Sequence, residues 1–259
     1  MKMTKLILPL AIASAFSADA ALIFNDTYNY TTGAPGDQTA LGTDLAARQC
    51  LGSTTSSYTE QLAGSGTRDA LLTNINSQSQ LRFRTTNTAS SPSQTAVDLN
   101  TNFASSLAGK QYSISLMDLA FVRGAAATLP TDIWFAISVG DTNTSISGPA
   151  DATADASVLI QAGGNMTKWE DNSNANGSQN AGLSLNYGFA TRYAIAELRI
   201  DETGAIKTAQ AYFKDMSGNE FTSDSWVIDF DNSTNRFIEL RAHQGSGGTD
   251  GTDVRETLI

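Results

Sequence analysis

Cysteine and histidine are almost absent: the 259 residues contain one of each, Cys50 and His243. A single cysteine excludes an internal disulfide, and we expect Cys50 to be buried as a small apolar side chain. One histidine excludes a zinc site with two histidine ligands, and one cysteine beside it cannot complete a structural zinc site. A catalytic triad would depend on His243, yet no Gly-x-Ser-x-Gly turn is present. We therefore expect His243 to lie at the surface or rim, at the end of a strand.

Charged residues are also scarce, at 16% of the chain, and they are unbalanced: 26 acidic against 16 basic residues give a net charge of −10. An acidic protein is a poor partner for nucleic acid and for anionic membrane surfaces. With 41% hydrophobic residues the chain is not disordered by composition. Serine, threonine, asparagine and glycine must therefore cover much of the surface, as is common in extracellular β-proteins.

Long hydrophobic runs are missing after the first 20 residues, so we expect no membrane span in the mature chain. Residues 1–20 themselves have the features of a signal peptide. Lys2 and Lys5 precede an apolar run over 6–16, and Ala18-Asp19-Ala20 matches the small-x-small pattern that signal peptidase recognises. We expect cleavage before Ala21 and export to the periplasm or the exterior.

Alternation of polar and apolar residues indicates strands. In 193–201, Ala194, Ala196, Leu198 and Ile200 share one face, and 236–243 repeats this pattern. A turn at Gly204 predicts a hairpin. About a dozen segments are predicted to be strands. Besides 193–201 and 236–243, they are 22–28, 81–84, 95–99, 110–123, 132–139, 157–162, 183–189, 206–214, 226–230 and 254–259.

Two longer runs, 110–123 and 132–139, have apolar residues on both faces, which is typical of central strands covered on both sides. In the first run the apolar face changes after Leu116, and a β-bulge near Met117 and Asp118 would explain the change. Helical turns are predicted only at 102–107 and within 37–50. The asparagine-rich segment 172–180 and the segment 142–155 are predicted to be loops.

Many short strands without alternating helices predict an all-β fold, a two-sheet antiparallel jelly-roll sandwich. No linker, repeat or change in composition divides the chain, so we expect one domain over 21–259.

Four segments carry a resemblance to a known family: 22–30 (LIFNDTYNY) followed by Gly33, 109–116 (GKQYSISL), 192–201 (RYAIAELRID) and 251–256 (GTDVRE). In order and spacing they resemble secreted bacterial concanavalin A-like, laminin-G-like jelly-roll proteins, many of them of the PEP-CTERM type. The sequence has no Pro-Glu-Pro motif followed by an apolar helix and a basic tail, so the resemblance does not extend to the C-terminal sorting segment. The tryptophan that often follows the opening glycines in such proteins is also missing.

The resemblance implies one metal site. Sandwiches of this kind often hold a structural calcium ion where the first and last strands lie side by side. The matching positions are Asp26 and Asp253, which can equally be ordinary aspartates at strand ends. A calcium loop at 172–183 is rejected, because Leu183 stands where a bidentate glutamate is needed. No other cofactor is expected.

Catalytic carboxylates are not arranged as in the glycosidases that share this fold, which present Glu-x-Asp-x-x-Glu on one strand. We interpret Glu197 and Glu239 as isolated, solvated glutamates. We therefore expect a protein that is not an enzyme.

Tryptophan is the side chain that most often stacks on sugars. Trp134 and Trp226 lie in apolar segments and are predicted to be in the core. Trp169 alone lies in polar surroundings, beside the asparagine-rich segment, and is the predicted ligand contact, although tryptophans that only cover a sheet are common.

Together these features predict a secreted, non-catalytic recognition or matrix protein that binds a polysaccharide or cell-surface glycan. One alternative is a divergent glycan-active hydrolase or lyase, in which carboxylates from separate strands, such as Glu197 and Glu239, would meet. Another is a structural adhesion protein that binds other proteins through its loops. The sequence does not distinguish oligomeric states or ligands.

Overall fold

The computed structural model describes residues 22–28, 58–64, 68–75, 78–85, 93–122, 133–141, 154–170, 173–187, 190–230, 234–244 and 251–259. The predicted leader at 1–20, Cys50, the predicted helical turn within 37–50 and most of the predicted loop at 142–155 lie outside these residues.

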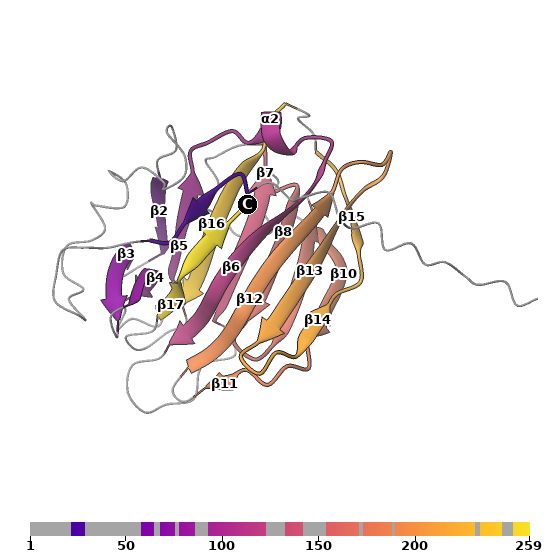
Figure 1. Cartoon of the computed structure of the whole chain (residues 1–259). Helices are drawn as coiled ribbons and strands as arrows, with labels where there is room; N and C mark the ends of the chain where they lie inside the picture. The colour runs from indigo at the N-terminus through magenta and orange to yellow at the C-terminus, as the bar shows by residue number, and fades with distance from the viewer. Residues whose placement is uncertain are drawn as a thin grey trace, which may run out of the picture.

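The described residues form two antiparallel β-sheets that face each other, as Figure 1 shows. The eleven-stranded sheet has the order β14 (Glu220–Thr222), β13 (Lys207–Asp215), β12 (Ala190–Asp201), β6 (Gln111–Val122), β17 (Gly251–Val254), β4 (Gln78–Thr85) and β3 (Arg68–Ile75). Four short strands join it: β1 (Asn25–Asp26), β11 (Asn186–Tyr187), β15 (Trp226–Ile228) and β18 (Glu256–Leu258).

The seven-stranded sheet has the order β10 (Ser173–Asn180), β9 (Asn165–Glu170), β8 (Ala156–Gln161), β7 (Trp134–Gly140), β16 (Phe237–Gln244), β5 (Ser93–Leu99) and β2 (Tyr58–Gly64). The helix α2 (Ala104–Leu107) lies within the predicted helical segment and at one end of the sandwich (Figure 1). The predicted fold, an all-β sandwich of two antiparallel sheets, is confirmed.

The core lies between the sheets and is built by alternation. On β12, Ala196, Leu198 and Ile200 are buried, whereas the side chains between them face outward. Phe83 of the larger sheet meets Phe135 of the smaller one edge to face, with ring centroids 5.2 Å apart. Burial of each such side chain contributes about 1.5–3 kcal/mol, so the shared interior is the main source of stability.

The predicted bulge in β6 is confirmed at Asp118, whose φ of 56° is in the left-handed region. Ile114 and Leu116 are buried before it, and Leu119 and Phe121 are buried after it, so the buried parity changes at this residue. The run has apolar residues at both parities because the bulge turns both halves toward the same core. On β7, by contrast, both faces are buried, as predicted.

The first and last described strands pair with each other: Asn25 lies opposite Leu258 and Asp26 opposite Thr257. Figure 1 shows the C-terminus in the middle of the larger sheet. The amides of Ile23 and Phe24 donate to the carbonyl oxygen of Ile259, at 2.6 and 3.1 Å. Both ends of the described chain therefore contribute to one sheet.

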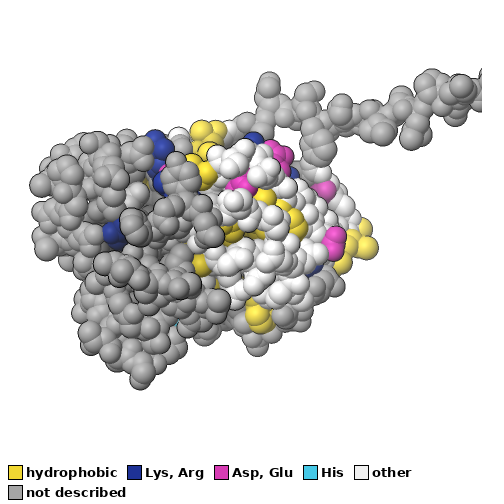
Figure 2. Space-filling model, turned by 90° about the horizontal axis from the view of Figure 1, so that it is seen from below, with side chains coloured by type: hydrophobic (Ala, Val, Ile, Leu, Met, Phe, Trp, Pro, Cys, Tyr) yellow, Lys and Arg dark blue, Asp and Glu magenta, His cyan; other side chains and the backbone are white. Residues whose placement is uncertain are grey.

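Few charges interrupt the described surface in Figure 2, where uncharged atoms dominate the visible face and acidic and basic side chains are scattered. Among the residues that the structure describes, no helix has the length and hydrophobicity needed to cross a membrane.

Candidate functional site

Trp169 lies on the outer face of the seven-stranded sheet. Lys168, the residue before it on β9, faces the core and is 1% exposed, so alternation directs Trp169 outward. Trp169 is half-buried, and its indole nitrogen is shielded and has no hydrogen-bond partner within the described part of the chain. Because this nitrogen is the only polar atom of the side chain, the exposed part of the side chain is an apolar ring surface.

Uncharged polar side chains continue from Trp169 along β9 and β10. Thr167 pairs with Ser178, and their hydroxyl oxygens are 2.7 Å apart. Asn165 pairs with Asn180, whose Nδ2 donates to Asn165 Oδ1 at 2.7 Å. These four residues and Trp169, called here the β9–β10 face, present hydroxyls, amides and one indole but no ionisable side chain.

The prediction of a loop at 172–180 is wrong, because Ser173–Asn180 forms β10, the edge strand of its sheet. Asparagine and glycine disfavour strands, but pairing with β9 outweighs this local preference. The register shifts between Asn174 and Ser178, where Gly177 has a φ of 73° that suits glycine. The clustered asparagines therefore mark a bulged edge strand.

The other two tryptophans have different positions. Trp226 is buried in the core, as predicted, and its Nε1 donates to the carbonyl oxygen of Trp169 at 3.3 Å. The prediction that Trp134 lies in the core is wrong. It is half-buried on the outer face, where its ring stacks on that of His243. The ring centroids are 5.1 Å apart and the interplanar angle is 7°. Trp134 is the first residue of the apolar strand β7, and alternation directs it away from the core, which Phe135 faces.

A row of polar residues lies next to Trp169 on the same outer face. Each residue of the row is the cross-strand partner of the one before it. Ser157 lies opposite Trp169, and Ser138 lies opposite Ser157, with their hydroxyl oxygens 2.8 Å apart. The row continues to Glu239 on β16 and Asp98 on β5. Ser138, Ser157 and Asp98 are buried, so the middle of the row is shielded, whereas Trp169 at one end is partly exposed.

Glu239 is not a solvated glutamate, contrary to the prediction. Its side chain is 13% exposed, forms an ion pair with Arg241 and lies opposite Asp98 on the neighbouring strand β5. Burial, followed by the charge of Asp98 and the hydrogen bond to it, raises the pKa of Glu239 well above its usual range, although Arg241 opposes this effect. The proximity of Asp98 to Glu239 could not be predicted from the sequence, because only the pairing of β5 with β16 brings these distant residues together.

The carboxylates named for a glycan-cleaving enzyme, Glu197 and Glu239, do not meet. Glu197 lies on the outer face of the eleven-stranded sheet, where it accepts a hydrogen bond from Arg199 at 3.1 Å and is 12% exposed. Glu239 is on the outer face of the other sheet. The core separates the two, so this pair cannot act on one substrate. Glu197 is also not solvated, contrary to the prediction.

Asp26 is buried at the pairing of β1 with β18. Its Oδ1 accepts a hydrogen bond from the amide of Tyr28 at 2.7 Å, and its Oδ2 accepts one from the hydroxyl of Tyr58 at 2.6 Å. Asp253 pairs with Ala120 and Arg82, in the strand before the one that meets β1. Among the described residues, no three acidic, histidine or cysteine side chains gather as a metal site. The calcium ion at Asp26 and Asp253 stays a prediction.

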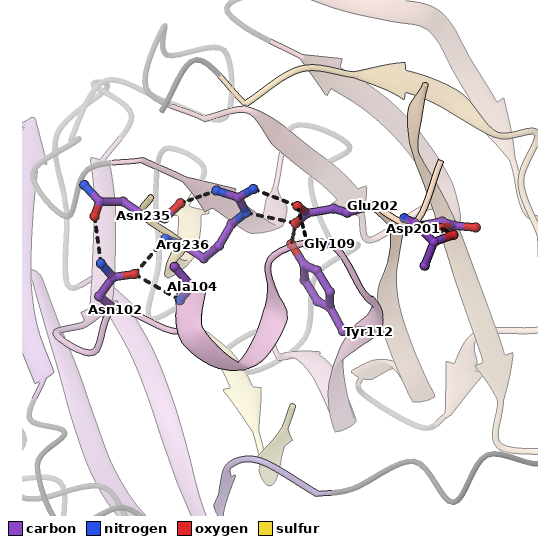
Figure 3. A network of polar contacts seen from close by, with 9 residues as sticks. Asn102, Ala104, Gly109, Tyr112, Asp201, Glu202, Asn235 and Arg236 are labelled. Carbon is purple, nitrogen blue, oxygen red and sulfur yellow. Dashed lines mark hydrogen bonds and ion pairs between the residues drawn. The ribbon is translucent and has the colours of Figure 1, made fainter. Parts of the chain in front are cut away.

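A second polar network lies at the end of β12, beside α2 (Figure 3). Arg236 and Glu202 are each 1% exposed, and the guanidinium donates to the carboxylate through Nε at 2.9 Å and Nη2 at 2.7 Å. The hydroxyl of Tyr112 and the amide of Gly109 also donate to Glu202, at 2.9 and 3.2 Å. With four donors on one carboxylate, this network is interpreted as a structural clasp between α2 and β12.

Among the known proteins compared with it, only solved structures are similar to this chain, and the similarity concerns the fold. No family model matches the chain, and no curated protein matches it. Solved structures of legume lectin-like, concanavalin A-like jelly-roll proteins are similar to it. They include a peanut lectin with a nine-residue peptide (10% identity, 79% of this chain and 97% of that chain, TM-score 0.47). A lectin from Bauhinia forficata in complex with GalNAc (11% identity, 80% and 93%, TM-score 0.49) and a legume lectin-like domain from Entamoeba histolytica (10% identity, 78% and 88%, TM-score 0.44) are others.

Proposed function

We propose that this protein binds carbohydrate without cleaving it, through the β9–β10 face. The observation that supports this most directly is the position of Trp169: a partly exposed ring surface beside a ladder of uncharged hydroxyls and amides. A sugar presents the same two kinds of surface, an apolar face of C–H groups and a rim of hydroxyls. Aromatic rings with a few polar groups placed beside them are typical of small-molecule sites.

The charge of the face favours a neutral saccharide. None of its five side chains is ionisable. The amide of Asn180 donates to Asn165 at 2.7 Å and accepts from the backbone amide of Gly182 at 2.8 Å, which fixes its orientation. Amide and hydroxyl groups can each donate and accept, as sugar hydroxyls do. A neutral hexose polymer is therefore the expected ligand class, at a cell surface or in exopolysaccharide.

Export is part of the proposal. The basic start, the apolar run and the small-x-small pattern of residues 1–20 support a cleaved signal peptide, and the resemblance to secreted bacterial jelly-roll proteins of the PEP-CTERM type agrees with it. A role in recognition or in an extracellular matrix would follow from binding outside the cytoplasm.

The test is retention on a glycan array, followed by isothermal titration with the best ligand and with the Trp169→Ala variant. Loss of the ring removes the stacking surface, and we expect the Kd to rise roughly tenfold or more, as is common for an aromatic residue at a binding centre. Tyr212→Ala is the matched control, because Tyr212 is a half-buried aromatic residue on the outer face of the other sheet. Absence of binding to every glycan, or equal losses in both variants, would contradict the proposal.

A further inference from the structure

The last three residues of β10 determine part of the β9–β10 face through their register. Ser178 and Asn180 are exposed on the outer face, whereas Gln179 between them lies opposite the buried Met166 and points to the other side of the sheet. Because side chains alternate along a strand, a shift by one residue would turn Gln179 outward and remove its two neighbours from the face. The register of 178–180 therefore fixes the composition of the candidate site.

The composition of β10 does not specify this register. The strand reads SNANGSQN, with polar residues at both parities, so no row of apolar side chains has to face the core. From Asn174 to Ser178 the strand β10 advances four residues, while β9 advances two, from Trp169 to Thr167. A bulge with one residue more or fewer would leave Asn174 in place and reverse the faces of 178–180. Contacts outside the ladder are needed to select the observed register.

Such contacts join Gln179 to the other sheet. Its Nε2 donates to Oδ2 of Asp224 at 2.7 Å, and its Oε1 accepts from the main-chain amide of Asp224 at 3.3 Å. Asp224 lies between β14 and β15, which both pair with β13, and β15 lies near β10 in Figure 1. One residue thus engages both polar atoms of the glutamine head group, and it can do so only when Gln179 points away from the outer face.

The segment that contains Asp224 is itself fixed. Ser223 is 3% exposed and bonds twice to Ala211 of β13. Its amide donates to the carbonyl oxygen at 2.9 Å, and its hydroxyl accepts from the amide at 3.0 Å. The buried Trp226 donates to the carbonyl oxygen of Trp169 at 3.3 Å. The segment 223–226 is therefore held by the larger sheet and contacts both β9 and β10.

We propose that Gln179 and Asp224 fix the register of 178–180 and thereby position Ser178 and Asn180 on the β9–β10 face. Both are positioning residues, because neither belongs to that face. The register is a property of the protein without ligand. Its effect on affinity rests on the proposed function, since an edge strand that is already ordered loses less conformational entropy when a saccharide binds.

The experiment exchanges the donor and the acceptor of this pair. In Gln179→Glu a carboxylate oxygen replaces the donor opposite the Asp224 carboxylate, so the hydrogen bond at 2.7 Å is lost and like charges meet. The double variant Gln179→Glu/Asp224→Asn restores one donor and one acceptor in reversed order. The reporter is the amide of Ala181, which donates to the carbonyl oxygen of Gly164 at 2.9 Å directly after β10.

Hydrogen exchange at Ala181 is measured without ligand. In Gln179→Glu it should be faster by roughly fivefold or more, the change that loss of one typical hydrogen bond causes in a local opening equilibrium. In the double variant the rate should return to near that of the wild type. Titration with a glycan should give the same order, with a Kd that rises by a similar factor and then recovers. The Tm should change by less than about 2–4 °C, because only the edge of one sheet is affected.

Gln210→Glu is the matched control. Gln210 donates through Nε2 to the carbonyl oxygen of Ser223 at 2.9 Å, so this variant makes the same substitution beside the same segment but not at β10. It should leave the exchange at Ala181 and the Kd unchanged.

Three results separate the possible failures. Unchanged exchange at Ala181 in Gln179→Glu, or no recovery in the double variant, overturns the role of the pair in the register. Faster exchange with an unchanged Kd overturns its role in positioning the site. If the wild type binds no glycan, the proposed function fails, and the exchange rates still decide whether Gln179 and Asp224 fix the register.

Discussion

Buried ionisable residues in this sandwich follow two different solutions. Glu202 is surrounded by donors, two of them from Arg236, so its charge is stabilised inside the protein. Glu239 lies opposite a second carboxyl group, that of Asp98, and burial together with this neighbour raises its pKa. The same residue type at similar burial therefore shifts its pKa in opposite directions, and the neighbours across the strands decide which direction applies.

At the residue scale, Glu202→Gln should be one of the most damaging single changes in the described chain. It keeps the shape of the side chain but removes the negative charge that pairs with the buried guanidinium of Arg236 at 2.7 Å. Breaking a buried pair in this way costs about 3–5 kcal/mol. Chemical unfolding measures the loss, and Glu220→Gln is the control, because Glu220 pairs with Lys214 at the exposed surface. Equal effects of the two substitutions would contradict the structural role of the clasp.

Glu202 should also make the free energy of unfolding depend on pH in the acidic range. Burial opposes the charge of Glu202, but hydrogen bonds from Arg236, Gly109 and Tyr112 outweigh it and lower the pKa of this carboxyl below 4.5. Its contribution is therefore present above about pH 4.5 and is lost as the pH falls through the folded-state pKa. In Glu202→Gln, the loss of stability that Glu202 causes as the pH falls should be absent.

At the element scale, strands with a strict period could be predicted from the sequence, and strands defined by their partners could not. The alternation of polar and apolar residues in 193–201 predicts β12. The change of the apolar face within 110–123 predicts the bulge. β10 has no such signal, because an edge strand needs pairing on one side only and tolerates asparagine. For the candidate site, Trp169 could be predicted from its polar surroundings. Its neighbours Thr167, Ser178 and Asn180 follow only from the register of β9 with β10.

The bulge at Asp118 gives a prediction with an unusual order of stabilities. Its φ of 56° costs a residue with a Cβ about 1–2 kcal/mol, and its side chain accepts a hydrogen bond from Arg192 Nε at 2.9 Å. Asp118→Gly and Asp118→Ala both lose that bond, so their difference reports the backbone alone. We expect glycine to be more stable than alanine by about 1 kcal/mol, the reverse of the order in a regular strand. Urea unfolding decides, and alanine equal to or above glycine would contradict a left-handed residue at this position.

At the scale of the whole molecule, the closure of the larger sheet depends on residues that are distant in sequence. β6 holds β12 on one side and both β17 and β18 on the other, and β18 in turn holds β1. The hydroxyls of Tyr28 and Thr257 are 2.7 Å apart across this last pairing. Forming such contacts closes a long loop, which costs more chain entropy than a pairing between strands that are adjacent in sequence.

Deletion of residues 256–259 tests this closure. It removes β18, the partner of β1, together with the carbonyl of Ile259 that accepts from Ile23 and Phe24 and the amide that donates to Phe24 at 3.0 Å. Phe24, buried against Phe103 with ring centroids 6.0 Å apart, would lose the strand that holds it. Hydrogen exchange should then show lost protection at 22–28 and along the side of β6 that faces β18, whereas the amides of β7 and β8 in the other sheet keep theirs. Leu258→Ala, which keeps the backbone pairing, is the control and should leave protection at 22–28 in place. Retained protection there after the deletion would mean that β1 is held by contacts other than β18, and the two ends of the chain would then contribute to the sheet independently.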